Sequence, residues 1–259
     1  MTTSDQISSG GMSRSYLLAE PEPAPTAKVP LIVVLHGINA SPQLEEQRTG
    51  FLPIVGPAVV VYPVGYHQSW NAGTCCGDAH SAGINDVAFI TAVINQVVAQ
   101  HPVLSSKQVY LVGYSNGGKM AWDMACQHPS LFAAVGVYGA VPAAACPTLG
   151  RLSAIEITGL ADTELTVQSS QAPTVQAGFT ELQVDTLVTR LRSGDGCGNA
   201  ATVVAHGVEQ TTTWGQCANG TKVAYSLYAG QNHNWPATTA TTPSAGSVMW
   251  SFFRSVGAT

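Results

Sequence analysis

Three residues in a fixed order could perform nucleophilic chemistry, and the first is Ser115, at the centre of Gly113-Tyr-Ser-Asn-Gly117. An apolar run, Val109–Val112, precedes this pentapeptide, and a helix-forming segment, Gly118–Gln127, follows it. A GxSxG motif between a strand and a helix is typical of a nucleophile elbow, whose tight turn exposes the serine hydroxyl. The alternative is a glycine-rich turn without chemistry. The flanking elements favour Ser115 as a nucleophile.

A serine needs a base that accepts its proton and a carboxylate that orients this base. In hydrolases with such an elbow, the order along the chain is serine, acid, histidine. Asp162 follows a predicted strand and a glycine turn, and His233 lies in the loop after the last predicted strand. We therefore predict Asp162 as the acid and His233 as the base. Glu164 is the alternative acid, whereas Glu156 lies within the strand itself.

The other six histidines fit the role of base less well. Some lie upstream of the serine, two precede proline at predicted helix ends, and one lies in a polar region. They are His36, His67, His80, His101, His128 and His206.

An oxyanion hole in such an enzyme uses two backbone N–H groups. We predict the amide of Asn116, directly after the nucleophile, and that of Ile38, in the loop after the predicted strand 31–35. Aromatic residues near these loops are candidates for substrate contact, with packing as the alternative; they are Tyr66, Trp70, Tyr114 and Trp235.

Two further interactions are expected from local spacing. Lys119 and Asp123 lie four residues apart on the helix after the elbow, a spacing that favours a surface ion pair. Asp86 begins another predicted helix and is expected to cap it.

Apolar strands and amphipathic helices alternate along the chain. Strands are predicted at 14–20, 31–35, 59–62, 109–112, 133–138, 154–158 and 223–228, and helices at 86–100, 118–127, 182–191 and 247–255. This alternation predicts a mostly parallel sheet flanked by helices. We expect a single α/β domain over residues 1–259, with its core at about 14–255 and an N-terminal extension at 1–13.

Composition excludes several classes of protein. Of the 259 residues, 45% are hydrophobic and 10% are charged, against about 25% charged in an average soluble protein. That apolar content is enough to drive collapse, which excludes a disordered chain. The net charge of −5 and the scattered basic residues argue against nucleic acid as a partner. No uncharged apolar run approaches the ~20 residues of a membrane span.

The six cysteines include no CxxC pair, which argues against a zinc site. Disulfides, and hence an oxidising compartment, explain an even count better. The sequence alone leaves fifteen pairings open. Residues 1–11 lack a basic segment followed by an apolar one. Either the sequence begins at a mature end, or export works in another way, or the thiols stay reduced. Of these, we expect a secreted protein whose signal peptide has been removed.

Several motifs together resemble the polyhydroxybutyrate depolymerase-like esterases, a group that includes secreted feruloyl and acetylxylan esterases. The motifs are Leu35-His-Gly37, Ser69-Trp-Asn-Ala-Gly73, Cys75-Cys76, Gly113-Tyr-Ser-Asn-Gly-Gly-Lys-Met-Ala121 and His233-Asn-Trp-Pro236. The resemblance runs from about residue 14 to residue 253. It implies an exported serine hydrolase of the α/β-hydrolase superfamily that needs no cofactor and no metal. Ser115, Asp162 and His233 occupy its catalytic positions.

The resemblance also implies disulfide pairs. Cys197 would pair with Cys217 and Cys126 with Cys146, which leaves Cys75 and Cys76 as a vicinal pair. Two departures from the family pattern affect the substrate. Ile38 stands where many relatives have a small or polar residue, which would narrow the acyl pocket. Gly-Gln-Asn at 230–232 replaces a glycine-rich turn before the base.

Together these observations predict a secreted serine esterase that forms an acyl-enzyme. Its substrates would be small or polymeric esters of the 3-hydroxybutyrate type or of aromatic acids such as ferulic acid. We expect a monomer with no membrane partner. An acyltransferase or a cyclising thioesterase could use the same three residues. A non-catalytic binding protein with the same fold is the alternative from another class.

Overall fold

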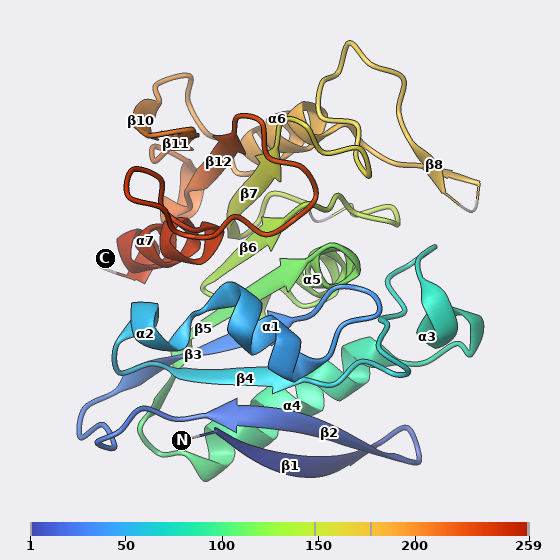
Figure 1. Ribbon diagram of the computed structural model, residues 1–259, viewed down its shortest axis with the longest axis vertical. Helices are drawn as coiled ribbons and strands as arrows, with labels where there is room; N and C mark the ends of the chain where they lie inside the picture. Colours follow the sequence, from blue (N-terminus) through green and yellow to red (C-terminus); the bar gives the residue numbers. More distant parts are fainter. Residues whose placement is uncertain (1, 148, 177, 258–259) are drawn as a thin grey trace.

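The fold is built on one ten-stranded sheet, seen in the computed structural model, which describes residues 2–147, 149–176 and 178–257 (Figure 1). The strand order is β1-β2-β4-β3-β5-β6-β7-β12-β11-β10. The six strands from β4 to β12 in this order are parallel, and two antiparallel strands extend each side. The strands are β1 (Thr2–Ser9), β2 (Met12–Ala19), β3 (Val29–Leu35), β4 (Val59–Pro63), β5 (Leu104–Tyr114), β6 (Ala134–Tyr138), β7 (Ser153–Gly159), β10 (Thr202–His206), β11 (Glu209–Trp214) and β12 (Val223–Tyr228).

Helices cover both faces of the sheet, as Figure 1 shows. The apolar faces of α4, α5 and α6 pack on one side, and those of α2 and α7 pack on the other. The helices are α1 (Pro42–Thr49), α2 (Leu52–Val55), α3 (Gly77–Ser81), α4 (Asp86–Gln100), α5 (Asn116–Gln127), α6 (Val184–Gly194) and α7 (Ala245–Gly257), and a small hairpin is formed by β8 (Val175–Gln176) and β9 (Phe179–Thr180). The predicted α/β class, with helices flanking a mostly parallel sheet, is confirmed.

Central strands are apolar at successive positions because each face of the sheet has its own core. In β3, Leu31 and Val33 belong to the cluster beneath α4 and α5, whereas Ile32 and Val34 belong to the cluster beneath α2 and α7. A strand that is buried on both faces therefore appears as a continuous apolar run. This is the pattern from which these strands were predicted.

Both edges of the sheet extend beyond the predicted strands. Residues that we expected to precede the core form β1, which pairs with β2 over the whole of Thr2–Ser9. At the other edge, β10 and β11 form a hairpin that the sequence did not predict. The residues of β10 are all exposed, including Val203 and Val204, so no buried face marks them as a strand.

Two predicted local interactions are wrong. The N-cap of α4 is Asn85, whose side chain accepts a hydrogen bond from the Ala88 amide at 2.9 Å. Asp86 instead forms a buried ion pair with Arg14 at 2.9 Å. Lys119 forms an ion pair with Glu181, while Asp123 accepts a hydrogen bond from the side chain of Gln127 at 3.0 Å.

Three disulfides join the six cysteines in the pairs that the family resemblance implied. They are Cys75–Cys76, Cys126–Cys146 and Cys197–Cys217. Across the described ranges, no helix has the length and apolar character needed to cross a membrane. The same residues contain no cluster of three or more His, Cys, Asp or Glu side chains that could hold a metal ion.

Candidate active site

Ser115 lies at the turn between β5 and α5, with φ 53° and ψ −120°. A positive φ is unusual for a serine and is the kind of backbone strain that occurs at functional sites. Glycines permit the turn. A Cβ on Gly113 would collide with the backbone of Gly117, and a Cβ on Gly117 would collide with the carbonyl of Leu35. The local sequence therefore folds into the sharp strand–turn–helix that GxSxG predicted.

An unbroken line of hydrogen bonds joins the three residues that the sequence singled out. His233 Nε2 lies 2.9 Å from Ser115 Oγ, and His233 Nδ1 lies 2.8 Å from Asp162 Oδ2. The other carboxylate oxygen of Asp162 accepts a hydrogen bond from the Glu164 amide at 2.8 Å. Glu164 thus contributes its backbone, while its own side chain lies exposed. In this arrangement the histidine can accept a proton from the serine while the carboxylate fixes its orientation.

The carboxylate and the histidine differ in their exposure to solvent. The side chain of Asp162 is fully buried, whereas that of His233 is 23% exposed. The remaining acid considered from sequence, Glu156, is fully buried in β7, and this burial raises its pKa well above the usual value. Burial therefore disfavours the charged form of this carboxyl group.

Two tyrosines hold the loop that carries His233. The hydroxyl of Tyr114 donates to the carbonyl of His233 at 2.9 Å. The hydroxyl of Tyr138 lies 2.8 Å from the carbonyl oxygens of both Asn232 and Asn234, on either side of the histidine. Sequence reasoning missed Tyr138. Its position at the end of β6 was the available signal, because sites in α/β proteins gather at the carboxyl ends of parallel strands.

The loop after β3 passes directly beside the serine. A Cβ on Gly37 would lie 3.5 Å from the Cβ of Ser115. His36 Nε2 accepts a hydrogen bond from the Gly65 amide at 2.9 Å, which fixes one end of the loop. Burial lowers the pKa of His36 to about 4, so its ring is neutral at pH 7 and can accept this bond. Gly37, which precedes Ile38, therefore lies beside the serine, and Asn116 directly follows the serine in the chain.

The four aromatic candidates for substrate contact differ in accessibility. Trp70 is fully buried, so it offers no surface to a substrate, and its packing alternative describes it better. Tyr114 and Trp235 are 9% and 8% exposed and pack against each other edge to face. Tyr66 is half-buried, with its ring stacked on that of His67. Of the four, Tyr66 has the surface best suited to contact a ligand.

A cation near the site was also missed. The guanidinium of Arg48 lies over the ring of Tyr114, 4.8 Å from its centroid. Arg48 also forms an ion pair with the buried Glu45 at 2.7 Å. Burial raises the pKa of Glu45 to about 7, although the neighbouring guanidinium of Arg48 acts to lower this pKa. Neither α1 nor this pair was expected from the sequence, because α1 has little apolar periodicity.

The sheet order, the helices on both faces and the strained serine turn define an α/β-hydrolase fold. The sequence profile of the family described as "Esterase PHB depolymerase" matches residues 14–175, which include Ser115 and Asp162. The chain belongs to this esterase family.

Two similar sequences are named as esterases. The chain is 32% identical over 169 residues to the protein described as "Putative esterase NocK" of Nocardia uniformis subsp. tsuyamanensis, a match that covers 62% of this chain and 48% of that protein. It is 31% identical over 113 residues to feruloyl esterase B of Piromyces equi, covering 40% of this chain and 20% of that protein. The chain therefore spans about half, or less, of the relatives that it matches.

A solved structure supports the fold over nearly the whole chain. Acetyl xylan esterase from Aspergillus awamori superposes with a TM-score of 0.65 at 15% identity, over 97% of this chain and 99% of that one. At this identity the likeness concerns the fold alone.

Proposed function

We propose that this protein is a serine carboxylic ester hydrolase that works through an acyl-enzyme on Ser115. The observation that carries the proposal is the pair of hydrogen bonds from Ser115 Oγ to His233 and from His233 to Asp162. Membership of an esterase family supports the same reaction class. The non-catalytic alternative requires a missing or misplaced member, and all three side chains are within hydrogen-bonding distance.

In the first half of the reaction, Ser115 Oγ attacks the ester carbonyl carbon and its proton passes to His233 Nε2. The carbonyl oxygen becomes an oxyanion, which the amides of Asn116 and Ile38 would stabilise. The carbon–oxygen bond to the alcohol then breaks, and the alcohol oxygen takes the proton from His233. The acyl group remains esterified to the serine.

In the second half, water attacks the acyl carbon while His233 accepts one of its protons. The bond to Ser115 Oγ breaks, the serine recovers the proton from His233, and the free acid leaves. Asp162 keeps the imidazole in the tautomer that bears hydrogen on Nδ1 and stabilises the imidazolium formed in each half. If an amine or another hydroxyl takes the place of water, the same steps give acyl transfer.

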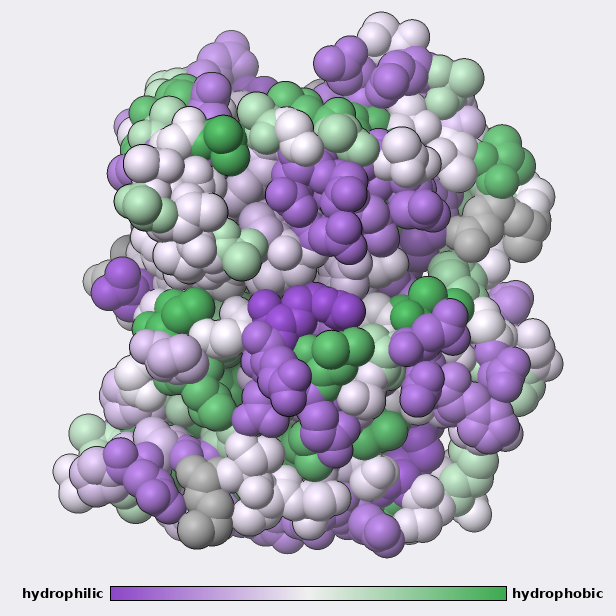
Figure 2. Space-filling model, viewed as in Figure 1, coloured by the Kyte–Doolittle hydropathy of each residue, from purple (hydrophilic) through white to green (hydrophobic). Residues whose placement is uncertain are grey.

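The substrate class rests on relatives and on the surface around the serine. The family description points to 3-hydroxybutyrate-type esters, and the feruloyl esterase relative points to aromatic acyl esters. Ile38 is 41% exposed and would present an apolar surface to either acyl group. Figure 2 shows hydrophilic and hydrophobic residues interspersed on the face in view, with hydrophobic residues in small groups. We propose soluble esters or oligomers as substrates.

We further propose that the protein works outside the reducing cytosol, as a monomer with no nucleic-acid or membrane partner. Three disulfides support an oxidising compartment, because cytosolic proteins of mesophiles rarely keep structural disulfides.

A panel of esters compared between wild type and Ser115→Ala tests the proposal. The panel contains p-nitrophenyl acetate and butyrate, methyl ferulate and a 3-hydroxybutyrate oligomer. We expect turnover by the wild type, with a preference for one acyl class, and loss of turnover in the variant. Activity retained by Ser115→Ala would refute the mechanism. If the serine reacts with a fluorophosphonate but no ester is hydrolysed, the result favours acyl transfer.

A further inference from the structure

Trp70 hydrogen-bonds to two segments that carry the proposed oxyanion donors. These oxyanion segments are residues 36–39, with the Ile38 amide, and residues 115–116, with the Asn116 amide. Trp70 is fully buried, in the loop that follows β4. The indole N–H donates to the carbonyl of His36 at 2.8 Å, and the two rings are 4.9 Å apart. This bond connects Trp70 to the segment that carries the Ile38 amide.

The backbone of Trp70 connects to the other segment. Its N–H donates to Oδ1 of Asn116 at 2.8 Å, and its carbonyl accepts from Nδ2 of the same side chain at 3.0 Å. Asn116 is buried, so these bonds are shielded from water. The carboxamide of Asn116 thus binds both the backbone N–H and the backbone carbonyl of Trp70, and the two hydrogen bonds fix this side chain against the Trp70 backbone. The residue whose amide follows the nucleophile is therefore tied by its side chain to the Trp70 loop.

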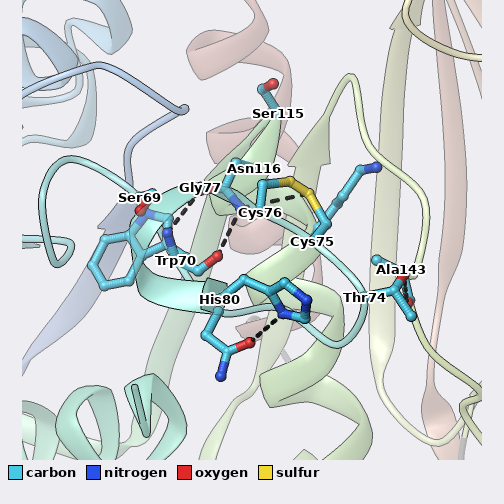
Figure 3. Close-up of a disulfide and its surroundings, with 12 residues drawn as sticks. Ser69, Trp70, Thr74, Cys75, Cys76, Gly77, His80, Ser115, Asn116 and Ala143 are labelled. Atoms are coloured by element: carbon cyan, nitrogen blue, oxygen red, sulfur yellow. Dashed lines mark hydrogen bonds between the residues drawn. A yellow bond between two sulfur atoms is a disulfide. The ribbon is translucent and has the colours of Figure 1, made fainter. Parts of the chain in front are cut away.

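The Cys75–Cys76 disulfide lies in the same loop, beside Asn116 and below Ser115 in the view of Figure 3. The Cys76 amide donates to the carbonyl of Trp70 at 3.1 Å, and Cys75 Sγ lies 3.9 Å from Nδ2 of Asn116. A disulfide stabilises a fold chiefly by closing a loop of the unfolded chain. Adjacent cysteines close no such loop, so the effect of this pair on the protein is local.

The segment after the disulfide also contacts the other donor. A Cβ on Gly77 would lie 3.3 Å from Cδ1 of Ile38, so Ile38 packs closely against this backbone. The Asn39 amide, next to Ile38, donates to the carbonyl of Gln68 in the same loop at 2.9 Å. The loop around Trp70 therefore contacts both oxyanion segments, while Trp70 itself hydrogen-bonds to both.

We propose that Trp70 is a positioning residue for the oxyanion hole, which it assembles by binding the Asn116 side chain through its backbone and the His36 carbonyl through its indole. The Cys75–Cys76 disulfide supports this arrangement from below. The inference rests on the proposed esterase function and assigns Trp70 an indirect role, since it touches neither substrate nor the reacting atoms.

Trp70→Phe removes the indole N–H and keeps an aromatic ring. Because misplacement of catalytic groups by about 1 Å can cost ~10²-fold in rate, we expect kcat to fall roughly 10- to 100-fold with little change in KM. The matched control is Trp122→Phe. Trp122 is also buried, and its indole N–H also donates to a backbone carbonyl, that of Ala140 at 3.1 Å. We expect this control to lose similar stability but to keep kcat within about threefold, because its indole N–H binds the carbonyl of Ala140 and not that of His36.

Amide hydrogen exchange gives a readout that does not depend on esterase activity. In Trp70→Phe we expect faster exchange in peptides covering both 36–40 and 113–118, and in Trp122→Phe we expect no such change at 36–40. If Trp70→Phe does not fold, Asn116→Ser tests the other half of the arrangement, with the same expected fall in kcat.

Three outcomes separate the possibilities. Equal loss of kcat in the two tryptophan variants, or unchanged exchange at 36–40 in Trp70→Phe, would overturn the positioning role. Turnover that persists in Ser115→Ala would instead refute the proposed mechanism, while hydrogen exchange would still decide whether Trp70 joins the two segments.

Discussion

At the residue scale, the roles of neighbouring carboxylates can be separated by experiment. Asp162 contacts His233 through its side chain, whereas Glu164 donates its backbone amide to Asp162. We predict that Asp162→Asn lowers kcat by about 10³- to 10⁴-fold, because the amide cannot hold the imidazole in its productive tautomer. Glu164→Gln is the matched control and should change kcat less than about threefold. A larger loss in Glu164→Gln would contradict the assignment.

A second prediction at this scale concerns His36 and stability. Burial lowers its pKa from 6.5 to about 4 in the folded protein. Between these values the unfolded chain binds a proton that the folded protein does not. The free energy of unfolding should therefore fall as pH drops from 6.5 to 4, by on the order of 3 kcal/mol from this residue.

Denaturant unfolding at pH 7 and pH 4.5 measures this contribution. His36→Gln cannot titrate, so its stability should change less between the two pH values than that of the wild type. His206→Gln is the control, because His206 is exposed on β10 and should leave the wild-type pH dependence intact. An unaltered pH dependence in His36→Gln would show that the residue does not act in this way.

At the element scale, the loop after β12 depends on hydroxyls from the ends of β5 and β6. Tyr138→Phe removes the contact with the carbonyls on both sides of His233. With about 1 kcal/mol per neutral hydrogen bond, we predict a fall in kcat of roughly 5- to 10-fold from a less ordered base. Steady-state kinetics checks the value.

Tyr228→Phe provides the comparison. Its hydroxyl donates to the carbonyl of Pro243 at 3.0 Å, in the same connection between β12 and α7 but away from the base. It should lose stability without a comparable loss of kcat. Similar losses of kcat in the two variants would contradict this prediction, because they would show that any lost hydrogen bond to this connection impairs the base equally.

The sequence predicted well the elements whose burial leaves a clear apolar pattern, either a continuous run in a strand or helical spacing in a helix. The runs that became β3, β4 and β5 were recognised because both faces are buried, and α4 matches its predicted bounds, Asp86–Gln100. In the hairpin β10–β11, β10 was missed because all its residues are exposed, and β11 because it is largely polar. α1 was missed because it is short and polar.

In the candidate site too, prediction depended on patterns that are visible in neighbouring residues of the sequence. Ser115, Asp162 and His233 were found because each follows a recognisable strand in the expected order. The contacts of Trp70 depend on residues far apart in the chain, so its burial could not be read from neighbours in sequence. An exposed aromatic residue and a buried one look alike in sequence, which is why both substrate contact and packing were considered for Trp70.

At the scale of the whole molecule, the disulfides divide into two kinds. Cys126–Cys146 spans 20 residues, whereas Cys75–Cys76 spans one. We predict that replacing Cys126 and Cys146 by alanine lowers the free energy of unfolding by about 3 kcal/mol, through the loop that they close. Replacing Cys75 and Cys76 by alanine should cost less than about 1 kcal/mol, yet lower kcat, because the pair acts next to Asn116. Chemical denaturation and kinetics of both variants test this contrast, which a large stability loss in the vicinal variant would contradict.

The central claim is that the ester's acyl group passes through Ser115. Rapid quenching of the wild type with p-nitrophenyl acetate, followed by mass spectrometry of its peptides, tests this most directly. We predict an acetyl group on the peptide that contains Ser115, formed together with a burst of p-nitrophenol in the wild type and formed far more slowly in His233→Ala. Turnover of the ester with the acetyl group absent from Ser115, or located on another residue, would contradict the account.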